Sequence, residues 1–326
     1  MKLTIATLIV AIAAVAAYAQ TPTLQIVTSD PNLPSDLFYG NVKVKPLRVR
    51  PGTNPPQFIT IDDSDFFTQQ QYVDFLSRMP DSSGFGFWVS QITFCGGNAA
   101  CTQVARVNTS GAFFLSIEFQ QTGYLVERMY KASYGDSNQT STLGGSHPIA
   151  VPVIRFSEFV PDVKQIGNGV IVNQGNWQAQ LEANKVSFSQ AFVQRSRFTT
   201  AYPTSTTPTN FVTSLANFAG VPANDPDRTK AINEFGAASD TSDVAARGRA
   251  LRDIAENATL QQNETNKAFV LMQYFGYLRR DPNGGQDTDY TGYDFWLTKL
   301  NQFNGNFINA EMVKAFIAAD EYRNRF

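Results

Sequence analysis

Apolar residues recur at helical spacing from Asp62 onward. Phe66, Val73 and Leu76 fall on one face of an expected helix, which Pro80 ends because proline cannot continue the hydrogen-bond ladder. Similar stripes follow along most of the remaining chain. The sequence therefore predicts a mainly α fold built from short amphipathic helices.

Two segments carry a tryptophan at the same place in a helical pattern. The apolar positions are Phe85, Trp88 and Ile92 in the first segment, and Tyr293, Trp296 and Leu300 in the last. This i, i+3, i+7 spacing places each tryptophan on an apolar helix face, so both are expected to pack in the core. Ser83 is expected to cap the first of these helices.

Three short patterns occur twice in the same order. Tyr-x-x-Phe/Tyr-Leu-x-Arg, Gly-Phe/Tyr-x-Phe-Trp-x-x-x-Ile/Leu and Ala-Phe-x-x-x-x-Glu-Phe/Tyr start at 72, 84 and 112, and again at 274, 292 and 315. The shared residues are Tyr72, Arg78, Gly84, Trp88 and Glu118 in the first copy, and Tyr274, Arg280, Gly292, Trp296 and Glu321 in the last. The sequence thus predicts tandem small helical units, clear at about 66–119 and 269–326 and degenerate at 124–198 and 211–265.

The segment before the helices differs in composition. Residues 22–60 are rich in proline, and apolar and polar residues alternate in short runs between the prolines, which predicts short strands or an extended arm. The segments 136–148 and 202–210 are rich in Ser, Thr, Gly and Pro, and are expected to be loops. The expected organisation is a signal peptide at 1–19, an extended or β arm at 20–61, a helical domain at 62–198 with the first two units, and another at 199–326 with the degenerate third and the clear fourth unit.

The amino end has the order of a secretory signal. Lys2 precedes an apolar run of about 15 residues, which is shorter than a membrane span, and Ala17 and Ala19 form a small-residue cleavage site. We expect a mature chain from Gln20 that is secreted, periplasmic or attached to the cell surface. No later stretch is long and apolar enough to predict a transmembrane helix.

The two cysteines agree with that compartment. Cys95 and Cys101 flank the flexible sequence Gly-Gly-Asn-Ala-Ala. In an oxidising compartment such a pair is expected to form a disulfide that staples a short loop.

The repeated patterns resemble the bacterial repeat called domain of unknown function 4214, which occurs, often in tandem, in secreted and surface proteins. The resemblance rests on Tyr72–Arg78, on the Pro-Asp-Ser-Ser-Gly-Phe-Gly-Phe-Trp stretch, on Ala112–Phe119 and on the same elements near the carboxyl end. It is weaker in the middle of the chain, and residues 281–291 depart from it by widening a turn. There is a fainter likeness to the noncatalytic helical linker modules of phycobilisomes. The resemblance implies a helical module in an extracellular or envelope setting and implies no reaction.

Charge and composition narrow the function classes. The 26 Lys and Arg nearly balance the 28 Asp and Glu, which gives no electrostatic support to nucleic-acid binding. His147 is the single histidine, which excludes a two-histidine zinc motif, and neither a phosphate-binding loop nor a dinucleotide fingerprint is present, so we expect no cofactor. A glycoside hydrolase needs only two carboxylates, and Asp62, Asp63, Asp65 and Asp81 are candidates near the first unit.

The widened turn before the last tryptophan suggests a possible cation site. Asp281, Asn283, Asp287 and Asp289 alternate in part like a calcium loop, although a bidentate glutamate at the twelfth position is missing. An ordinary turn explains the same residues. A thermal melt that calcium leaves unchanged would remove the calcium hypothesis.

The repeated Arg and Glu suggest a second hypothesis. Arg78 with Glu118, and Arg280 with Glu321, are expected to form ion pairs that join the first and last helices of a unit. The leading functional expectation is a noncatalytic secreted or envelope interaction module that binds polysaccharide or a surface protein. A carboxylate-based glycoside hydrolase and a calcium-dependent adhesion component are the alternatives.

Overall fold

The computed structural model describes residues 24–27, 36–39, 42–46, 48–50, 52–55 and 57–326. The signal peptide expected at 1–19 lies outside these residues. The chain divides into two compact units, one of residues 1–60 with Phe326 and one of residues Ile61–Arg325. Each is described by itself.

The smaller unit contains short antiparallel strands. The strands β1 (Leu24–Val27), β2 (Asp36–Tyr39) and β3 (Val42–Pro46) form a three-stranded sheet in chain order. The strands β4 (Arg48–Val49) and β5 (Phe58–Ile59) form a separate pair. Strands β1, β3 and β4 lie in the runs where apolar and polar residues alternate in the sequence.

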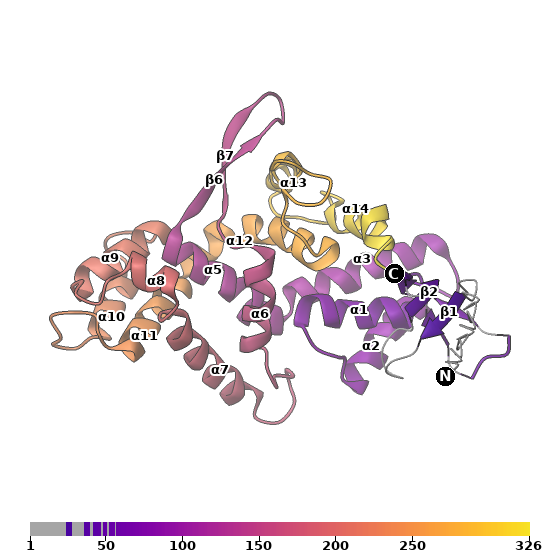
Figure 1. Ribbon diagram of the computed structural model, residues 1–326, viewed down its shortest axis with the longest axis horizontal. Coiled ribbons are helices and arrows are strands. Elements are labelled where there is room, and N and C mark those ends of the chain that lie inside the picture. Colours follow the sequence, from indigo (N-terminus) through magenta and orange to yellow (C-terminus); the bar gives the residue numbers. More distant parts are fainter. Residues whose placement is uncertain (1–23, 28–35, 40–41, 47, 51, 56) are drawn as a thin grey trace, which may run out of the picture. The chain divides into compact units, whose positions relative to one another are not determined.

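The larger unit is helical, which confirms the mainly α prediction. We group its helices by the four repeat units predicted from the sequence, which from here on are called the first to the fourth unit (Figure 1). The first unit has α1 (Ser64–Leu76), α2 (Ser82–Thr93), α3 (Ala99–Leu115) and α4 (Ile117–Gln121), and the second has α5 (Gly123–Tyr134), α6 (Phe156–Ile166), α7 (Trp177–Phe192) and α8 (Ser196–Ala201). The third has α9 (Pro208–Ala219), α10 (Pro226–Asn233) and α11 (Val244–Ala255). The fourth has α12 (Ala258–Gln273), the π-helical turn η1 (Tyr274–Leu278), α13 (Thr291–Gln302), α14 (Met312–Ala318) and α15 (Asp320–Arg323).

Local signals set the ends of the helices in the first and last units. Helix α1 ends before Ser77, and η1 ends before Arg279, and both residues take left-handed backbone angles, with φ of 54° and 56°. Each of their N–H groups bonds back to the carbonyl of the repeated tyrosine, Tyr72 or Tyr274. The residue that caps α2 is Asp81, whose carboxylate accepts from the Gly84 N–H, so the expectation that Ser83 caps this helix was wrong.

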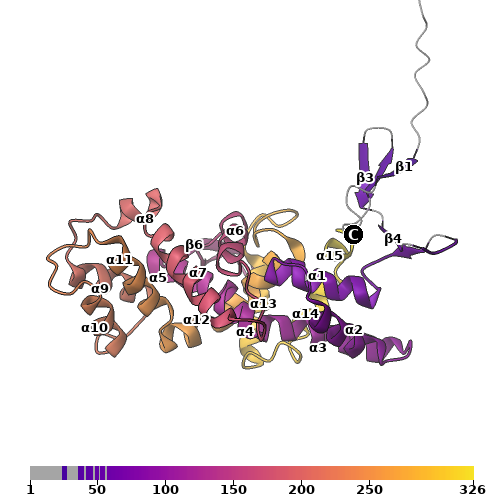
Figure 2. The ribbon, with the colours of Figure 1, turned by 90° about the horizontal axis from the view of Figure 1, so that it is seen from below.

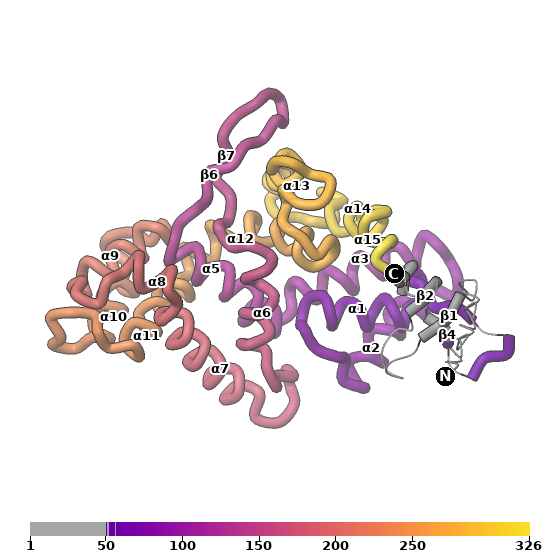
Figure 3. The backbone as a smooth tube through the Cα atoms, viewed as in Figure 1, coloured from indigo at the N-terminus to yellow at the C-terminus, as the bar shows by residue number. Residues whose placement is uncertain are grey.

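The four units associate in two pairs that are built alike. In the first and fourth units, α1 packs on η1 and α3 packs on α14; in the second and third, α5 packs on α9 and α7 packs on α11. Each contact thus joins helices that hold the same place in the order of their units, with α12 and the adjoining η1 counted as one helix. The path in Figure 3 runs from the first unit through the second and third and returns to the first unit, and Figures 1 and 2 both show α14 beside α3.

The centre of the first pair joins two equivalent residues of the repeat. Phe75 and Tyr277 hold the same position in the first pattern, and their rings meet edge to face with centroids 5.1 Å apart. The Ser110 and Tyr277 hydroxyl groups are hydrogen-bonded, and Phe114 packs on Phe269 with centroids 5.0 Å apart. The first and last units therefore share one core within the compact unit Ile61–Arg325.

One expected loop is regular structure. Residues 136–148 were expected to be irregular, but β6 (Asp136–Ser141) and β7 (His147–Pro152) pair in an antiparallel hairpin that projects from the helices (Figure 1). Its turn contains Gly144 and Gly145, whose φ angles of 69° and 125° suit glycine. Among the described helices, none is long and apolar enough to cross a membrane.

Candidate functional site

The first and last units build the same cluster from their repeated residues. The hydroxyl of Tyr72 lies against the backbone of Gly84, where a Cβ would sit 2.3 Å from it. The hydroxyl of Tyr274 lies in the same way against Gly292, at 2.6 Å from an added Cβ. The repeated glycine is thus explained by the close approach of the repeated tyrosine, since any side chain there would overlap it.

This contact predicts a rescue between two substitutions. Gly84→Ala is expected to destabilise the chain by about 1–3 kcal/mol, because the new methyl group overlaps the Tyr72 hydroxyl. Tyr72→Phe removes that oxygen, so the double variant is expected to recover much of the loss. Urea denaturation of the two single variants and the double variant measures the coupling. Additive losses would contradict this account of the repeat.

Both hypothesised ion pairs are present. Arg78 Nε and Nη2 donate to the two carboxylate oxygens of Glu118 at 2.7 and 2.8 Å, and Arg280 makes the same bidentate contact with Glu321 at 2.5 and 2.9 Å. Burial by itself would lower the pKa of the Arg78 guanidinium, but the hydrogen bonds and the charge of Glu118 outweigh it and raise that pKa. Each pair ties the end of a first helix to the short closing helix.

The two repeated tryptophans lie at the edge of the core. Trp88 packs against Phe113 and Trp296 against Phe316, with centroids 5.8 and 5.7 Å apart. Both indoles are only partly buried, so the expectation that they are core residues was wrong in part. Each is also flanked by a strongly exposed phenylalanine of its own helix.

The two copies differ in what lies against the arginine of the pair. In the last copy the inserted turn folds back on Arg280: Asp287 accepts from Arg280 Nη2 at 2.8 Å, and a Cβ on Gly285 would lie 3.0 Å from the Arg280 side chain. In the first copy the pair borders an open pocket of about 390 Å³. The pocket is lined by Tyr72, Leu76, Arg78, Asp81, Ser83, Gly84, Trp88, Ala112, Phe113, Ser116, Ile117, Glu118, Val172, Asn173 and Gln174.

One wall of this pocket comes from another unit, and sequence reasoning missed it. Val172, Asn173 and Gln174 belong to the segment between α6 and α7, and Asn173 has a left-handed φ of 68°. Both amide side chains are exposed. No sequence signal connects them with the first unit, because their proximity depends on how the first and second units pack.

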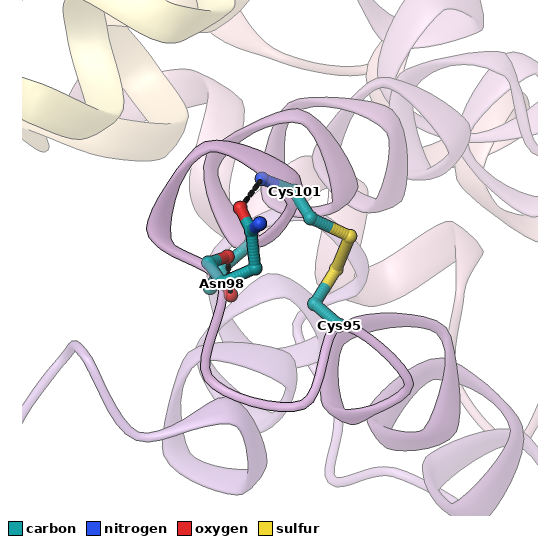
Figure 4. Close-up of a disulfide and its surroundings, with 4 residues drawn as sticks. Cys95, Asn98 and Cys101 are labelled. Atoms are coloured by element: carbon teal, nitrogen blue, oxygen red, sulfur yellow. Dashed lines mark hydrogen bonds between the residues drawn. A yellow bond between two sulfur atoms is a disulfide. The ribbon is translucent and has the colours of Figure 1, made fainter.

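A second hollow lies next to the same tryptophan. Its volume is about 550 Å³, and its lining includes Trp88, Phe94, Cys101 and Val104 but no charged side chain among the described residues. Phe94 is 72% exposed and Val104 is 59% exposed. The disulfide between Cys95 and Cys101 joins the end of α2 to the first turn of α3, which confirms that prediction (Figure 4).

The acids near the first unit are held in different places. Asp81 Oδ1 accepts from the Gly84 N–H at 2.9 Å and from the Ser83 hydroxyl at 2.7 Å, and it lines the pocket together with Glu118. The Gly84 N–H lowers the pKa of the Asp81 carboxyl, because it donates to the ionised form. The other hydrolase candidates, Asp62, Asp63 and Asp65, do not line this pocket; Asp62 pairs with Arg106 and Arg323.

The four candidate calcium ligands each hydrogen-bond elsewhere. Asp281 accepts from the Phe156 N–H, Asn283 from Arg155, Asp287 from Arg280, and Asp289 from the Thr291 N–H. Among the described residues, no group of three or more His, Cys, Asp or Glu side chains is placed to hold a metal ion. Calcium binding at this turn stays a prediction of the sequence.

The single histidine belongs to a contact between the hairpin and α13. His147 Nε2 lies 3.1 Å from Asp294 Oδ2, and Ser141 Oγ donates to the same oxygen at 2.6 Å. In a serine hydrolase the serine bonds to the imidazole and the carboxylate bonds to the opposite nitrogen. Here both groups meet one carboxylate oxygen, which fits a structural contact and not that catalytic arrangement.

The second unit holds its own version of the Arg–acid contact. Arg195 makes bidentate hydrogen bonds with Asp162 at 2.6 and 2.7 Å, and Tyr130 also donates to Asp162. Arg197 replaces the repeated glutamate in the sequence and pairs with Glu158 at 3.2 Å. These residues border a hollow of about 270 Å³, which is smaller than the pocket of the first unit.

No family model, characterised protein or solved structure matches this chain.

Proposed function

We propose that the chain is a noncatalytic module of the cell envelope or the extracellular space, and that it binds polysaccharide in the pocket of the first unit. The leader-like sequence at 1–19 and the Cys95–Cys101 disulfide support an oxidising compartment outside the cytoplasm. The resemblance to the secreted repeat family points to the same setting.

The observation that carries the proposal is the combination of groups around Trp88. Its partly exposed ring offers an apolar platform to a sugar ring, while Asn173, Gln174 and Ser83 supply uncharged hydrogen-bonding groups around it. The matching Trp296 stands in a copy where the inserted turn lies against Arg280 and Asp287 accepts from its Nη2. We therefore place the binding site in the first unit.

The two acids of the pocket favour binding over hydrolysis. Glu118 accepts two hydrogen bonds from Arg78, and Asp81 caps α2, so both carboxylates already have structural partners. A glycosidase needs one carboxylic acid that donates a proton and a second carboxylate as base or nucleophile. A glycoside hydrolase is the second candidate because both acids line one pocket; release of reducing ends that Asp81→Asn abolishes would favour it.

Affinity electrophoresis tests the proposal directly. The chain from Gln20 onward is run through gels that contain xyloglucan, pullulan, laminarin or galactomannan. We expect retardation by at least one of them, and we expect Trp88→Ala to weaken it by about 30-fold, which corresponds to a binding residue worth about 2 kcal/mol.

Trp296→Ala is the matched control, since it removes the same residue from the last copy. It is expected to leave the retardation unchanged while altering stability much as Trp88→Ala does. Retardation by none of the four polymers, or equal losses from the two variants, would contradict the proposal. Specific retention of a surface protein in place of a polymer would favour the other partner class, for which the exposed Phe94 and Val104 are the candidate contacts.

A further inference from the structure

We infer that the pocket of the first unit selects uncharged glycan chains over acidic ones, and that Asp81 sets this selectivity. The inference rests on the proposed function and deepens it by naming the ligand class. It concerns which polysaccharide binds, whereas the proposed function concerns whether any does.

The charges of the lining residues provide the first step. Among the described residues that line the pocket, Arg78 carries the positive charge and Asp81 and Glu118 carry negative charges. The sum is one positive and two negative charges, so the pocket is negative overall. A glycan carboxylate that enters it approaches an excess of like charge.

The Nε and Nη2 donors of Arg78 are not available to a ligand as a bidentate pair. Nε and Nη2 of Arg78 donate to the two oxygens of Glu118, and Nη1 donates to the Met79 carbonyl at 3.1 Å. Arginine recognises a carboxylate best through two parallel N–H groups. The pair of donors suited to a uronic acid is already used by Glu118.

Asp81 is the more exposed of the two carboxylates, with 15% of its side chain exposed, close to the 18% of Arg78. Its Oδ1 accepts from Gly84 and Ser83, whereas its Oδ2 forms an ion pair with Arg78 Nη1 at 3.6 Å, which is beyond ordinary hydrogen-bond length. Oδ2 is therefore placed to accept from a sugar hydroxyl. Glu118, in contrast, uses both oxygens and its side chain is only 6% exposed. A hydroxyl-rich neutral chain satisfies Asp81, while an acidic chain is repelled by it.

A conservative variant tests the effect of the Asp81 charge on binding without disturbing the fold. Asp81→Asn keeps the size and the ability to cap α2, because asparagine is as good an N-cap as aspartate. The ligands are the neutral polymer that the wild-type chain binds and the same polymer with part of its C6 hydroxymethyl groups oxidised to carboxylates. The matched control is Asp287→Asn, which removes the aspartate beside Arg280 in the last copy.

We expect the wild-type chain to bind the oxidised polymer about fivefold more weakly than its neutral parent at low salt, and expect this ratio to shrink at high salt as the charges are screened. Asp81→Asn is expected to bring the ratio close to one, and Asp287→Asn to leave it unchanged. Melting temperatures of both variants check that the fold is retained.

Two outcomes overturn the inference while the proposed function stands. One is equal binding of the neutral and oxidised polymers by the wild-type chain. The other is a ratio that Asp81→Asn does not change. Failure to bind any of the four neutral polymers or their oxidised forms would instead overturn the proposed function itself.

Discussion

Glu118→Gln is expected to lower the free energy of unfolding by about 3 kcal/mol, because it removes the carboxylate hydrogen-bonded to the largely buried Arg78 guanidinium and leaves only Asp81, 3.6 Å away, as a charged partner. The Arg78 and Glu118 side chains are 18% and 6% exposed, so water replaces little of the lost interaction. The pair also joins α4 to the end of α1. Urea denaturation followed by circular dichroism gives the loss directly.

The last copy supplies the control for this prediction. Glu321 makes the same bidentate contact but is 36% exposed, and Arg280 keeps a second carboxylate partner in Asp287. Glu321→Gln is therefore expected to cost only about 1 kcal/mol, close to the value of exposed pairs. If the two variants lose the same stability, burial does not decide the strength of this repeated contact.

Glu127→Gln is expected to stabilise the chain at neutral and alkaline pH. Glu127 on α5 is 1% exposed, and neither of its carboxylate oxygens has a hydrogen-bond partner among the described residues. Burial raises the pKa of this carboxyl well above its usual range, and the nearby charge of Glu264 raises it further, although Arg128 and Lys131 act in the opposite direction. Glutamine removes the cost of burying this charge.

The raised pKa fixes the direction of the pH dependence. The folded state holds the proton of Glu127 more tightly than the unfolded state, so its contribution is fully present below the unfolded pKa of 4.5. That contribution is lost as the pH rises from there toward the folded pKa, with a limiting slope of about 1.4 kcal/mol per pH unit for one proton.

Unfolding free energies of the wild type and of Glu127→Gln, measured between acidic and alkaline pH, test this sign. The advantage of the variant is expected to grow as the pH rises. Glu311→Gln, at an exposed glutamate beside Lys314, serves as the control and is not expected to show that growth. A difference between Glu127→Gln and the wild type that stays constant with pH would contradict the prediction.

The sequence predicted contacts best where one residue type recurs at one place in both copies. The pairing of Arg78 with Glu118 followed from the same two residue types appearing at Arg280 and Glu321, because a repeated fold brings equivalent positions into equivalent contact. The disulfide followed from a spacing short enough for loop closure. The first inference depends on repetition of the fold, and only the second depends on local geometry.

The sequence could not predict how deeply the tryptophans are buried, or that residues 172–174 of the second unit line the pocket. Helical periodicity assigns Trp88 to an apolar face but does not say how completely that face is covered. The covering depends on neighbours such as Asn173, which comes from another unit. The hairpin at 136–152 was missed because β6 is polar throughout and β7 has a proline near each end, so neither strand shows the alternation that marks a half-buried sheet.

The nested pairing of the units predicts an order in which they assemble. The second and third units meet through residues such as Glu182 and Arg252, which are 70 positions apart, whereas Ser110 and Tyr277 of the outer pair are 167 apart. Contacts close in sequence form sooner, because less chain entropy is lost in closing the loop. The inner pair is therefore expected to assemble while Phe75 and its neighbours in the first unit still lack their partner. Until the fourth unit docks, the apolar inner face of the first unit is the part of the folding chain that most needs protection from aggregation.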